Sequence, residues 1–452
     1  MNKRMIMLMA AALALLSAGG QVIFSGVGEH HVIEVTPETT TGLNKIYVVY
    51  NTDGVSMSFN SMTGEPATWE SFYYSNGHLV MEPVAGVRWN GMSTTVDKIT
   101  PNRGYKIVEG TTPFYCWVVN YADYPLELNG MSFNNEEPCN LVSFNIDGHA
   151  DPIYYYTLDG LPQVLDREIK LKYNTLVWIN DSTDYHWEEQ PVVELFAALD
   201  QGVEIAPPLC NTEFTLSGDR FLEEWGMGKI IPCDYYYTQA VECKAFAFQE
   251  KRSNDNEKGL GSGQENALGG SAPCRIVFKG YPTDAVVYRL WEMATDEEFQ
   301  NVIMQFNQDE VDYTFEEYGT YYMRYTVANA SGECQFQSEP FRITVSESYL
   351  ECPNIFSPGT TPGDNDIWKV SYKSLIEFHC WIYNRWGNLL YEFTDPGGGW
   401  DGYYRGKLVD TGVYFYVVTA LGSDGFKYKK RGTISILHFK KSNPDAPSNP
   451  GV

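Results

Sequence analysis

Short runs of alternating apolar and polar residues dominate the hydrophobic pattern of this chain; clear examples are residues 45–50, 114–119, 168–171 and 321–327. Gly, Asn, Asp and Pro interrupt such runs roughly every ten residues, and the periodicity of long helices is scarce. This spacing is typical of antiparallel β-sandwiches. It predicts an all-β protein built from tandem Ig-like β-sandwich domains.

The chain is too long for one hydrophobic core, because single cores stop growing well below its 452 residues. We predict a β-sandwich over residues 21–122, a second over 123–207, and an Ig- or PKD-like domain over 208–349. Within the last domain, residues 251–271 are rich in Gly, Asn, Ser and charge. They offer no apolar anchor whose burial could offset the entropy of ordering, so we expect a mobile loop. A short apolar segment at 191–199 fits a helix or a strand equally well.

The N-terminus has the pattern of a secretory signal peptide. Lys3 and Arg4 precede an apolar run at 5–16, and small residues follow at 17–20. A basic start, a short apolar core and a small-residue exit are typical of such peptides, so we predict that residues 1–20 are removed on export. The apolar run is too short to cross a bilayer comfortably as a helix, which disfavours a retained anchor.

Charge is distributed unevenly along the chain. The net charge is −26, from 32 Lys plus Arg and 58 Asp plus Glu. Residues 351–452 are close to neutral, with 11 basic against 10 acidic side chains, whereas residues 21–350 hold 19 against 48. The acidic part repels nucleic acid and anionic lipid surfaces, so we expect no nucleic-acid partner. The asymmetry indicates separate roles for the two parts.

Nine cysteines in an exported chain are candidates for disulfides. Residues 274–345 resemble an immunoglobulin or PKD-type domain, because Cys274 opens a strand-like run, Trp291 follows, and a long hairpin comes next. In that fold a Trp packs against a disulfide between the sheets. The resemblance implies a Cys274–Cys334 bond. Since Cys334 lies beyond the strand at 321–327, this bond would join a strand start to a hairpin tip.

The densest pattern of the chain lies near its end. An alternating run at 378–383 leads into a turn at 384–388, where Gly and Asn tolerate positive φ. Residues 413–420 are the strongest strand candidate of the chain. We expect Trp386 and Trp400 to be core side chains that close the ends of a small sandwich.

The order of these motifs resembles the gliding-motility-associated C-terminal domain, which is the type B sorting domain of the type IX secretion system of Bacteroidota. The resemblance covers about residues 353–437, and we place the domain, a small β-sandwich, at 350–438. The residues that carry the resemblance are Phe356, Pro358, Asn365, Asp366, Asn384, Arg385, Trp386, Gly387, Trp400, Asp401, Gly402, Gly412, Tyr414, Asp424 and Gly425.

The resemblance implies an export route. Such cargo crosses the inner membrane, folds in the periplasm, and is recognised through its C-terminal domain by the type IX translocon. Type B domains typically use an outer-membrane barrel partner of the PorP/SprF family, and the cargo reaches the cell surface or the medium. The resemblance is silent about residues 21–350. Residues 439–452, rich in Pro, Asn and Ser, are predicted to be a disordered tail.

The family that this domain resembles often has Pro-Asn-Gly-Asp-Gly-x-Asn-Asp in the first loop, with a spacing like that of oxygen ligands for Ca²⁺. Here only Asp364, Asn365 and Asp366 stand at the equivalent positions. Calcium prefers several carboxylate and carbonyl oxygens on one short loop. Turn-stabilising Asx side chains are therefore favoured over a bound ion, and no cofactor is expected.

A basic run lies on or beside the last predicted strand of the domain. Its members are Lys427, Lys429, Lys430 and Arg431. We expect this patch either to contribute to partner recognition or to protect an edge strand from aggregation, as Lys often does.

No catalytic motif is found in the sequence: it has no His-Glu-x-x-His, nucleophile elbow or phosphate loop. Asp181, Asp184, Glu188 and Glu189 surround Trp187 and would suit a sugar-binding cleft, but a solvated acidic loop is favoured in so acidic a chain. We predict a non-enzymatic cell-surface adhesion or assembly protein with a surface glycan or protein as ligand. The alternatives are an exported glycan hydrolase and a passive glycan-binding module.

Overall fold

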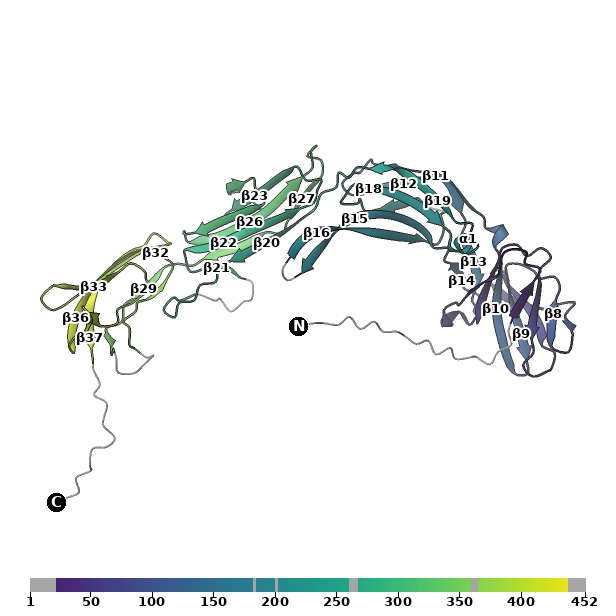
Figure 1. Ribbon diagram of the computed structural model, residues 1–452, viewed down its shortest axis with the longest axis horizontal. Coiled ribbons are helices and arrows are strands. Elements are labelled where there is room, and N and C mark those ends of the chain that lie inside the picture. The colour runs from purple at the N-terminus through teal and green to yellow at the C-terminus, as the bar shows by residue number, and fades with distance from the viewer. Residues whose placement is uncertain (1–21, 182–183, 200–201, 260–266, 359–364, 438–452) are drawn as a thin grey trace, which may run out of the picture. The chain divides into compact units, whose positions relative to one another are not determined.

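The computed structural model describes residues 22–181, 184–199, 202–259, 267–358 and 365–437. The predicted signal peptide and C-terminal tail lie outside these residues. Strands provide nearly all of the regular structure (Figure 1), which confirms the predicted all-β fold of tandem Ig-like sandwiches. In the described part of the chain, no helix has the length and apolar character needed to span a membrane.

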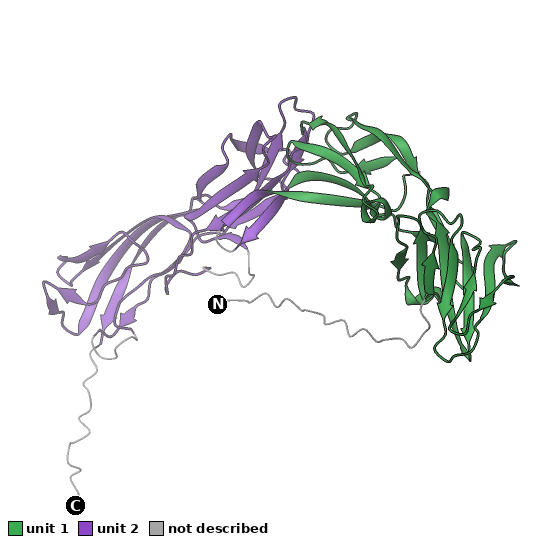
Figure 2. Ribbon diagram, turned by 45° about the vertical axis from the view of Figure 1, so that its right-hand side comes forward, with its two compact units in different colours: residues 1–175, 189–238 green, residues 176–188, 239–452 purple. Residues whose placement is uncertain are grey.

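The chain divides into two compact units (Figure 2), and unit 1 comprises residues 1–175 and 189–238. The elements of its first domain are β1 (Val22–Ser25), β2 (Ile33–Val35), the 3-10 helix η1 (Thr39–Thr41), β3 (Lys45–Val49), β4 (Ser56–Asn60), β5 (Thr68–Ser75), β6 (His78–Pro83), β7 (Arg88–Trp89), β8 (Ser93–Val96), β9 (Arg103–Glu109) and β10 (Thr112–Asn120). They form two sheets, with strand orders β1-β4-β8-β7 and β2-β3-β10-β9-β5-β6.

Strand β3 is buried on both faces, because its alternate residues point into different cores. Tyr47 and Val49 pack between the two sheets of the first domain. Ile46 and Val48 belong to a second cluster, which continues into the next domain. A strand that is covered on both faces has a continuous run of apolar residues in its sequence, and not an alternation of apolar and polar residues. The first two domains therefore share a buried layer.

Most of the second domain also lies in unit 1, but its residues 176–188 belong to unit 2. Its elements are η2 (Tyr121–Asp123), β11 (Leu126–Asn134), β12 (Val142–Ala150), β13 (Ile153–Tyr156), β14 (Pro162–Leu165), β15 (Ile169–Asp181), β16 (Asp184–Phe196), β17 (Val203–Ile205), β18 (Thr212–Gly218), α1 (Arg220–Glu224) and β19 (Lys229–Tyr236). Strands β11-β12-β17 and β16-β15-β18-β19 form the two main sheets, and β13 pairs with β14.

The predicted domain boundary at residue 207 is wrong. Strand β18 pairs with β15, with Leu216 opposite Leu171, so both strands belong to one sheet. The Pro-containing stretch at 206–211 connects β17 to β18 within a single sandwich and is not a linker between domains. The domain therefore continues through β19. Most of the ambiguous segment 191–199 is strand, as part of β16.

A buried ion pair, which gave no signal in the sequence, stabilises this domain. Arg167 Nε donates to Asp219 Oδ2 at 2.7 Å, and neither side chain is exposed. The same guanidinium donates to Tyr121 Oη at 3.1 Å and to the carbonyl oxygens of Asp151 and Tyr124 at 2.9 Å. Removing one member of such a pair leaves an uncompensated buried charge, at a cost of about 3–5 kcal/mol.

Unit 2 comprises residues 176–188 and 239–452, and its first domain is an Ig-like sandwich (Figure 2). Its strands are β20 (Cys243–Gln249), β21 (Leu268–Gly270), β22 (Cys274–Pro282), β23 (Tyr288–Ala294), β24 (Val302–Phe306), β25 (Glu310–Phe315), β26 (Gly319–Ala328), β27 (Gln335–Gln337) and β28 (Phe341–Val345). The sheets are β20-β22-β25 and β21-β28-β26-β23-β24, with β27 beside β26. Trp291 is fully buried between them.

The predicted Cys274–Cys334 disulfide is wrong, because the buried Cys274 has a free thiol. Cys274 starts the nine-residue strand β22, after which the chain turns into β23, whose first residue pairs with Ala328. Cys334 follows Ala328 by one turn and therefore lies near the far end of β22. Nine strand residues span about 30 Å, whereas a disulfide needs Cα atoms within about 7 Å.

The segment 251–271, predicted to be a mobile loop, is ordered in part. Residues 251–259 are described, and Glu257 among them is only 7% exposed. Residues 268–270 form β21, and 260–266 lie outside the described residues. The prediction considered only apolar anchors, whereas this segment is held by polar groups of the following domain.

The last domain of unit 2 is a small β-sandwich. Its strands are β29 (Tyr349–Glu351), β30 (Ile355–Phe356), β31 (Ser371–Lys373), β32 (Leu375–Tyr383), β33 (Leu389–Phe393), β34 (Tyr403–Tyr404), β35 (Lys407–Leu408), β36 (Gly412–Gly422) and β37 (Lys427–Ile436). The main sheet has the order β30-β37-β36-β32-β33, and β29-β31 and β34-β35 form separate pairs. The turn predicted at 384–388 joins β32 to β33 in a hairpin, and residues 423–425 lie in the turn between β36 and β37.

Candidate functional site

Part of the motif in the last domain builds its core. Trp400 has no exposed surface, and its ring centroid lies 5.6 Å from those of Phe356 and Tyr414. Its backbone pairs with that of Trp368 through two hydrogen bonds of 2.8 and 3.0 Å. Its indole N–H donates to the Tyr403 carbonyl oxygen at 3.1 Å, which satisfies the polar group of a buried ring. The core role predicted for Trp400 is confirmed.

The Asn and Asp residues of the motif fix its turns. Asn384 Oδ1 accepts hydrogen bonds from the backbone N–H groups of Trp386 and Asn388, at 3.0 Å each. Asp401 and Asp424 accept in the same way from the residue two positions on, also at 3.0 Å. These are Asx turns. The glycines with left-handed φ that complete the turns are Gly387 (81°), Gly402 (80°) and Gly425 (75°).

Gly402 also allows a close approach of two segments. A Cβ at this position would lie 2.8 Å from the ring of the buried Pro358. The motif thus places Pro358 and Gly402 against each other at the end of the sandwich, while Gly412 begins β36. These positions serve the fold.

Trp386 does not close the core, and this prediction is wrong. Its side chain is 71% exposed, and the guanidinium carbon of Arg385 lies 4.1 Å from the ring centroid. The Asx turn at Asn384 places Trp386 at the hairpin tip, beyond the last ladder pair of Tyr383 with Leu389. An exposed Trp stacked on an Arg combines the two residue types that most often dominate binding interfaces.

The sheet face opposite the core is apolar at the end next to this tip. Val413 and Phe415 are 50% and 43% exposed, and Phe415 lies opposite Tyr383 on β32. Alternate residues of β36, including Tyr414 and Tyr416, pack against the core instead. We name this exposed side of the main sheet, with the tip at 385–386, the outer face.

The basic patch is split between the two faces of the sheet. Lys427, Lys429 and Arg431 are exposed at alternate positions of β37 and form a column on the outer face. Lys430 points to the other side, where its Nζ donates to the Leu350 carbonyl oxygen at 2.6 Å. Lys430 therefore holds the first strand of the domain, and the other three of the four predicted residues are exposed on the outer face.

Next to this column the outer face is hollowed. The hollow has a volume of about 720 Å³, and Glu377, His379 and Lys429 are among its lining residues. His379 stacks on Trp381 with ring centroids 3.8 Å apart, and its Nε2 lies 3.4 Å from Glu392 Oε2. From tip to base, the outer face thus passes from apolar and aromatic to charged.

The candidate calcium ligands are only partly described, because Asp364 lies outside the described residues. Asn365 has a left-handed φ of 56°, and its carbonyl oxygen accepts a hydrogen bond from the N–H of Ser357 at 3.0 Å. This is a turn role. Where the chain is described, no group of three or more His, Cys, Asp or Glu could hold a metal ion.

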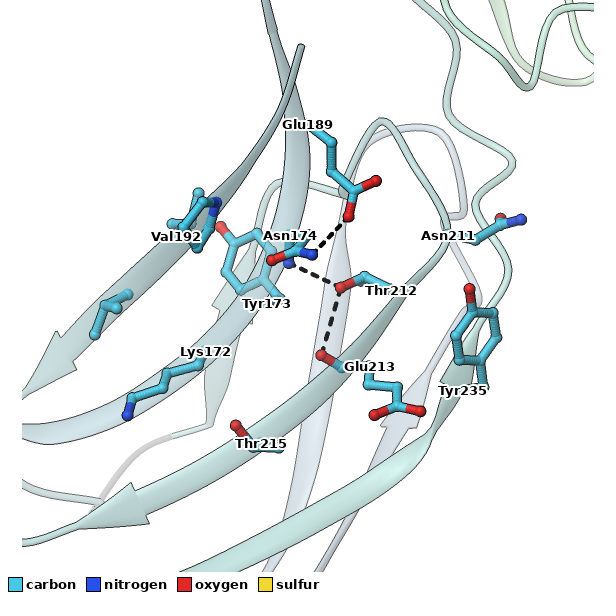
Figure 3. A pocket seen from close by; sticks show the side chains of 12 residues that line it. Lys172, Tyr173, Asn174, Glu189, Val192, Asn211, Thr212, Glu213, Thr215 and Tyr235 are labelled. Carbon is cyan, nitrogen blue, oxygen red and sulfur yellow. Dashed lines mark hydrogen bonds between the residues drawn. The ribbon is translucent and has the colours of Figure 1, made fainter.

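A second hollow lies in unit 1, on strands β15, β16, β18 and β19 (Figure 3). Its volume is about 420 Å³. Asn174 Nδ2 donates to Glu189 Oε1 at 2.6 Å, and the Asn174 backbone N–H donates to Thr212 Oγ1 at 2.8 Å. Glu213 and Tyr235 also line it. Amide, carboxylate and hydroxyl groups around an open hollow suit a polar ligand.

Trp187, which lies among the candidate acidic residues, is held by neighbouring groups of unit 2. The Trp187 indole N–H donates to the Tyr281 carbonyl oxygen at 2.9 Å, and its ring centroid lies 5.3 Å from that of Trp178. The ring is therefore used for packing inside unit 2. Of the four carboxylates, only Glu189 lines the hollow of Figure 3.

Comparison with known proteins assigns two regions of the chain. Residues 350–436 match the CHU_C type IX secretion signal domain, and residues 132–232 match a fibronectin type III domain, Fn3_FA. Among curated proteins, none matches this sequence.

Three solved structures are similar over much of the chain. They are a tetra-tandem repeat from the extending region of a large adhesion protein (TM-score 0.21, 9% identity, 86% of this chain and 96% of that chain), a Ca²⁺-stabilised adhesin with which an Antarctic bacterium binds ice (0.19, 12%, 86% and 96%), and immunoglobulin domains 1–5 of Sidekick-1 (0.24, 9%, 87% and 78%). TM-scores of this size carry no argument about function.

The match at 350–436 coincides with the resemblance predicted from the motifs, and it confirms that prediction. The match at 132–232 covers β-sandwich strands of the second domain. The chain therefore carries a CHU_C type IX secretion signal domain in residues 350–436, preceded by β-sandwich domains of the fibronectin type III and Ig kind.

Proposed function

We propose that this protein is type IX secretion cargo that acts at the cell surface as a non-enzymatic adhesion or assembly protein. The observation that carries the proposal is the signal domain at 350–436, which implies export and an interaction with the type IX machinery. The domains before it contain most of the acidic residues, so they repel anionic surfaces and stay soluble in transit. Consecutive β-sandwich domains without a catalytic motif in their sequence suit binding rather than chemistry.

The outer face of the signal domain is the surface that fits recognition. Trp386 and Phe415 supply apolar anchors, and interfaces draw most of their affinity from a few such anchors. Lys427, Lys429 and Arg431 form a charged rim, which steers association with acidic groups. We assign this face to an outer-membrane barrel partner of the PorP/SprF kind.

Export itself is tested by deletion in the native host. The full chain should become accessible to added protease on intact cells, whereas a chain lacking residues 350–436 should stay inside the outer membrane. Immunoblots of protease-treated and lysed cells measure both fractions. Surface arrival of the shortened chain would exclude the proposal.

A second candidate function is glycan binding in the hollow of Figure 3, where carboxylate, amide and tyrosine groups converge. A glycan array with the secreted protein would show discrete hits. The substitutions Glu213→Gln and Asn174→Ala should remove these hits, because they delete groups to which sugar hydroxyls would bind. Glu204→Gln, at an exposed glutamate outside the hollow, is the matched control. Hits that survive both changes would exclude this site.

A further inference from the structure

A segment of the Ig-like domain lies along the signal domain as an additional strand. The N–H of Lys258 donates to the Tyr372 carbonyl oxygen at 2.7 Å, and the N–H of Tyr372 donates to the Asn256 carbonyl oxygen at 3.0 Å. Glu257 thus forms a parallel bridge with Tyr372 of β31. Since β31 also pairs with β29, the segment extends this pair by strand addition.

Side chains of the segment fix its register. Asn256 Nδ2 donates to the carbonyl oxygens of Val370, at 2.9 Å, and Pro396, at 2.8 Å. Asn254 Nδ2 donates to Tyr372 Oη at 3.2 Å. Val370 follows Trp368 and Pro396 precedes Trp400, so the two carbonyl groups belong to the two chain segments that the Trp368–Trp400 β-bridge joins. Asn256 therefore joins parts of the signal domain that are far apart in sequence.

A buried carboxylate anchors the segment. Glu257 Oε1 forms an ion pair with Arg252 Nη2 at 3.0 Å, and Glu257 Oε2 accepts a hydrogen bond from Tyr372 Oη at 3.1 Å. Burial, together with this carboxylate, raises the pKa of Tyr372 to about 12. Burying a charge is costly unless it is paired and hydrogen-bonded. This arrangement is typical of a domain interior and not of a loop in passing contact.

A second pair of bonds closes the junction. The N–H of Ser374 donates to Ser271 Oγ at 2.8 Å, and the N–H of Ala272 donates to Ser374 Oγ at 3.1 Å. The segment follows β20 and precedes β22, and residues 243–249 of β20 pair with residues 276–282 of β22. Its two ends are therefore positioned only when this ladder of the Ig-like domain has formed.

We propose that the export signal of this protein is composite: residues 252–259 of the Ig-like domain complete the signal domain, so that the machinery receives a finished signal only from cargo whose last domain has folded. This inference rests on the proposed function of residues 350–436 in export. The contributing residues lie outside the family match. The device couples folding of the cargo to presentation of its signal.

The test uses the full chain with Asn256→Ala and Glu257→Gln combined. Hydrogen exchange at the amides of Lys258 and Tyr372 should accelerate by about tenfold or more, because buried carbonyl groups lose their donor. Exchange within β36 should stay unchanged. The surface-exposed fraction in the native host should fall by a similar factor. Asp255→Ala, at an exposed neighbour, is the control and should change neither quantity.

Unchanged exchange, or unchanged surface arrival despite faster exchange, would overturn the composite signal. If exchange within β36 also accelerates in the double variant, the single variant Tyr372→Phe is measured instead. It removes only the hydroxyl that donates to Glu257. Unaltered exchange at the Lys258 amide of this variant would then overturn the proposal. The proposed function fails separately, when the unmodified chain reaches the surface of cells that lack the type IX translocon.

Discussion

Two tryptophans of the signal domain occupy similar motifs and opposite environments. Trp400, in Gly-Trp-Asp-Gly, is fully buried and paired with Trp368, whereas Trp386, in Asn-Arg-Trp-Gly, is exposed at a hairpin tip beside Arg385. An Asx side chain fixes a glycine-containing turn at each position: Trp386 lies within the turn of Asn384, and Trp400 directly precedes the turn of Asp401. The two turns therefore use the same side-chain chemistry. Whether the indole ring is buried or exposed depends on where the turn lies relative to the sheet.

The difference separates residues that build the signal from residues that present it. A buried Trp contributes to the free energy of unfolding, whereas an exposed Trp contributes almost nothing to it. Under the proposed function, the exposed ring is available to the export machinery.

The largest effect is expected for Trp400→Ala. Deleting a fully buried Trp costs about 3–5 kcal/mol, through lost transfer energy and the cavity left behind. The signal domain should unfold at markedly lower urea, measured by tryptophan fluorescence of the purified protein. Export should fail as a consequence. A change in unfolding free energy below about 1 kcal/mol would contradict the core role.

Trp386→Ala should reverse this profile. Its unfolding free energy should stay within about 0.5 kcal/mol of the unmodified protein, as for most exposed positions. Surface arrival should nevertheless drop by about tenfold, the effect of truncating an interface anchor. Trp89→Ala, at an exposed Trp on β7, is the matched control and should export normally. Normal export of Trp386→Ala would refute the recognition role.

Charge reversal on the outer face should have a smaller effect. Replacing Lys427, Lys429 and Arg431 by Glu should slow export several-fold by reducing steered association, and the binding of the purified protein to outer-membrane vesicles should weaken most at low salt. Lys430 is left in place because it holds Leu350.

The control for this variant reverses three exposed lysines in unit 1. These are Lys98, Lys172 and Lys229. If the column on β37 serves only to protect an edge strand, Glu protects it equally well, and both triple variants should behave like the unmodified chain. In that case, only the apolar end of the outer face, near Trp386 and Phe415, would contact the export partner.

The smallest effect is expected for Asp424→Asn, tested against pH. Partial burial raises the pKa of Asp424, but hydrogen bonds from Phe426 and Ser348 outweigh it and lower the pKa below its usual range. The folded-state pKa lies below the unfolded one, so the carboxylate stabilises the hairpin at neutral pH and loses this effect as pH falls below about 4.

Asp424→Asn should therefore lower Tm at pH 7 and leave it unchanged near pH 2.5, measured by calorimetry. Because the group is exposed, the difference should be about 1 kcal/mol or less. An equal loss at both pH values would show that shape, and not charge, matters at this turn.

The sequence predicted the strands, the turns and the extent of the signal domain well, because these depend on local patterns. Alternation along 413–420 and the Asx-Gly turns fix the hairpins without help from distant residues. The exposure of Trp386 was not predictable in this way, because it depends on where the sheet ends. The inward direction of Lys430 depends likewise on a partner at Leu350.

The remaining errors concern long-range contacts. The buried Arg167–Asp219 pair joins residues 52 positions apart, and Asn256 reaches Pro396 across 140 positions. No periodicity or spacing reports such contacts. The failure at 251–259 has the same origin, since its anchors in the following domain are carbonyl groups and the Tyr372 hydroxyl.

Placing a photoreactive phenylalanine analogue at position 386 of the full chain, and irradiating native cells during export, tests the account most directly. We predict a covalent adduct with an outer-membrane component of the type IX machinery, identified by mass spectrometry and missing when the analogue stands at position 89. No adduct at 386, or the same adduct from both positions, would contradict the assignment of the outer face to recognition.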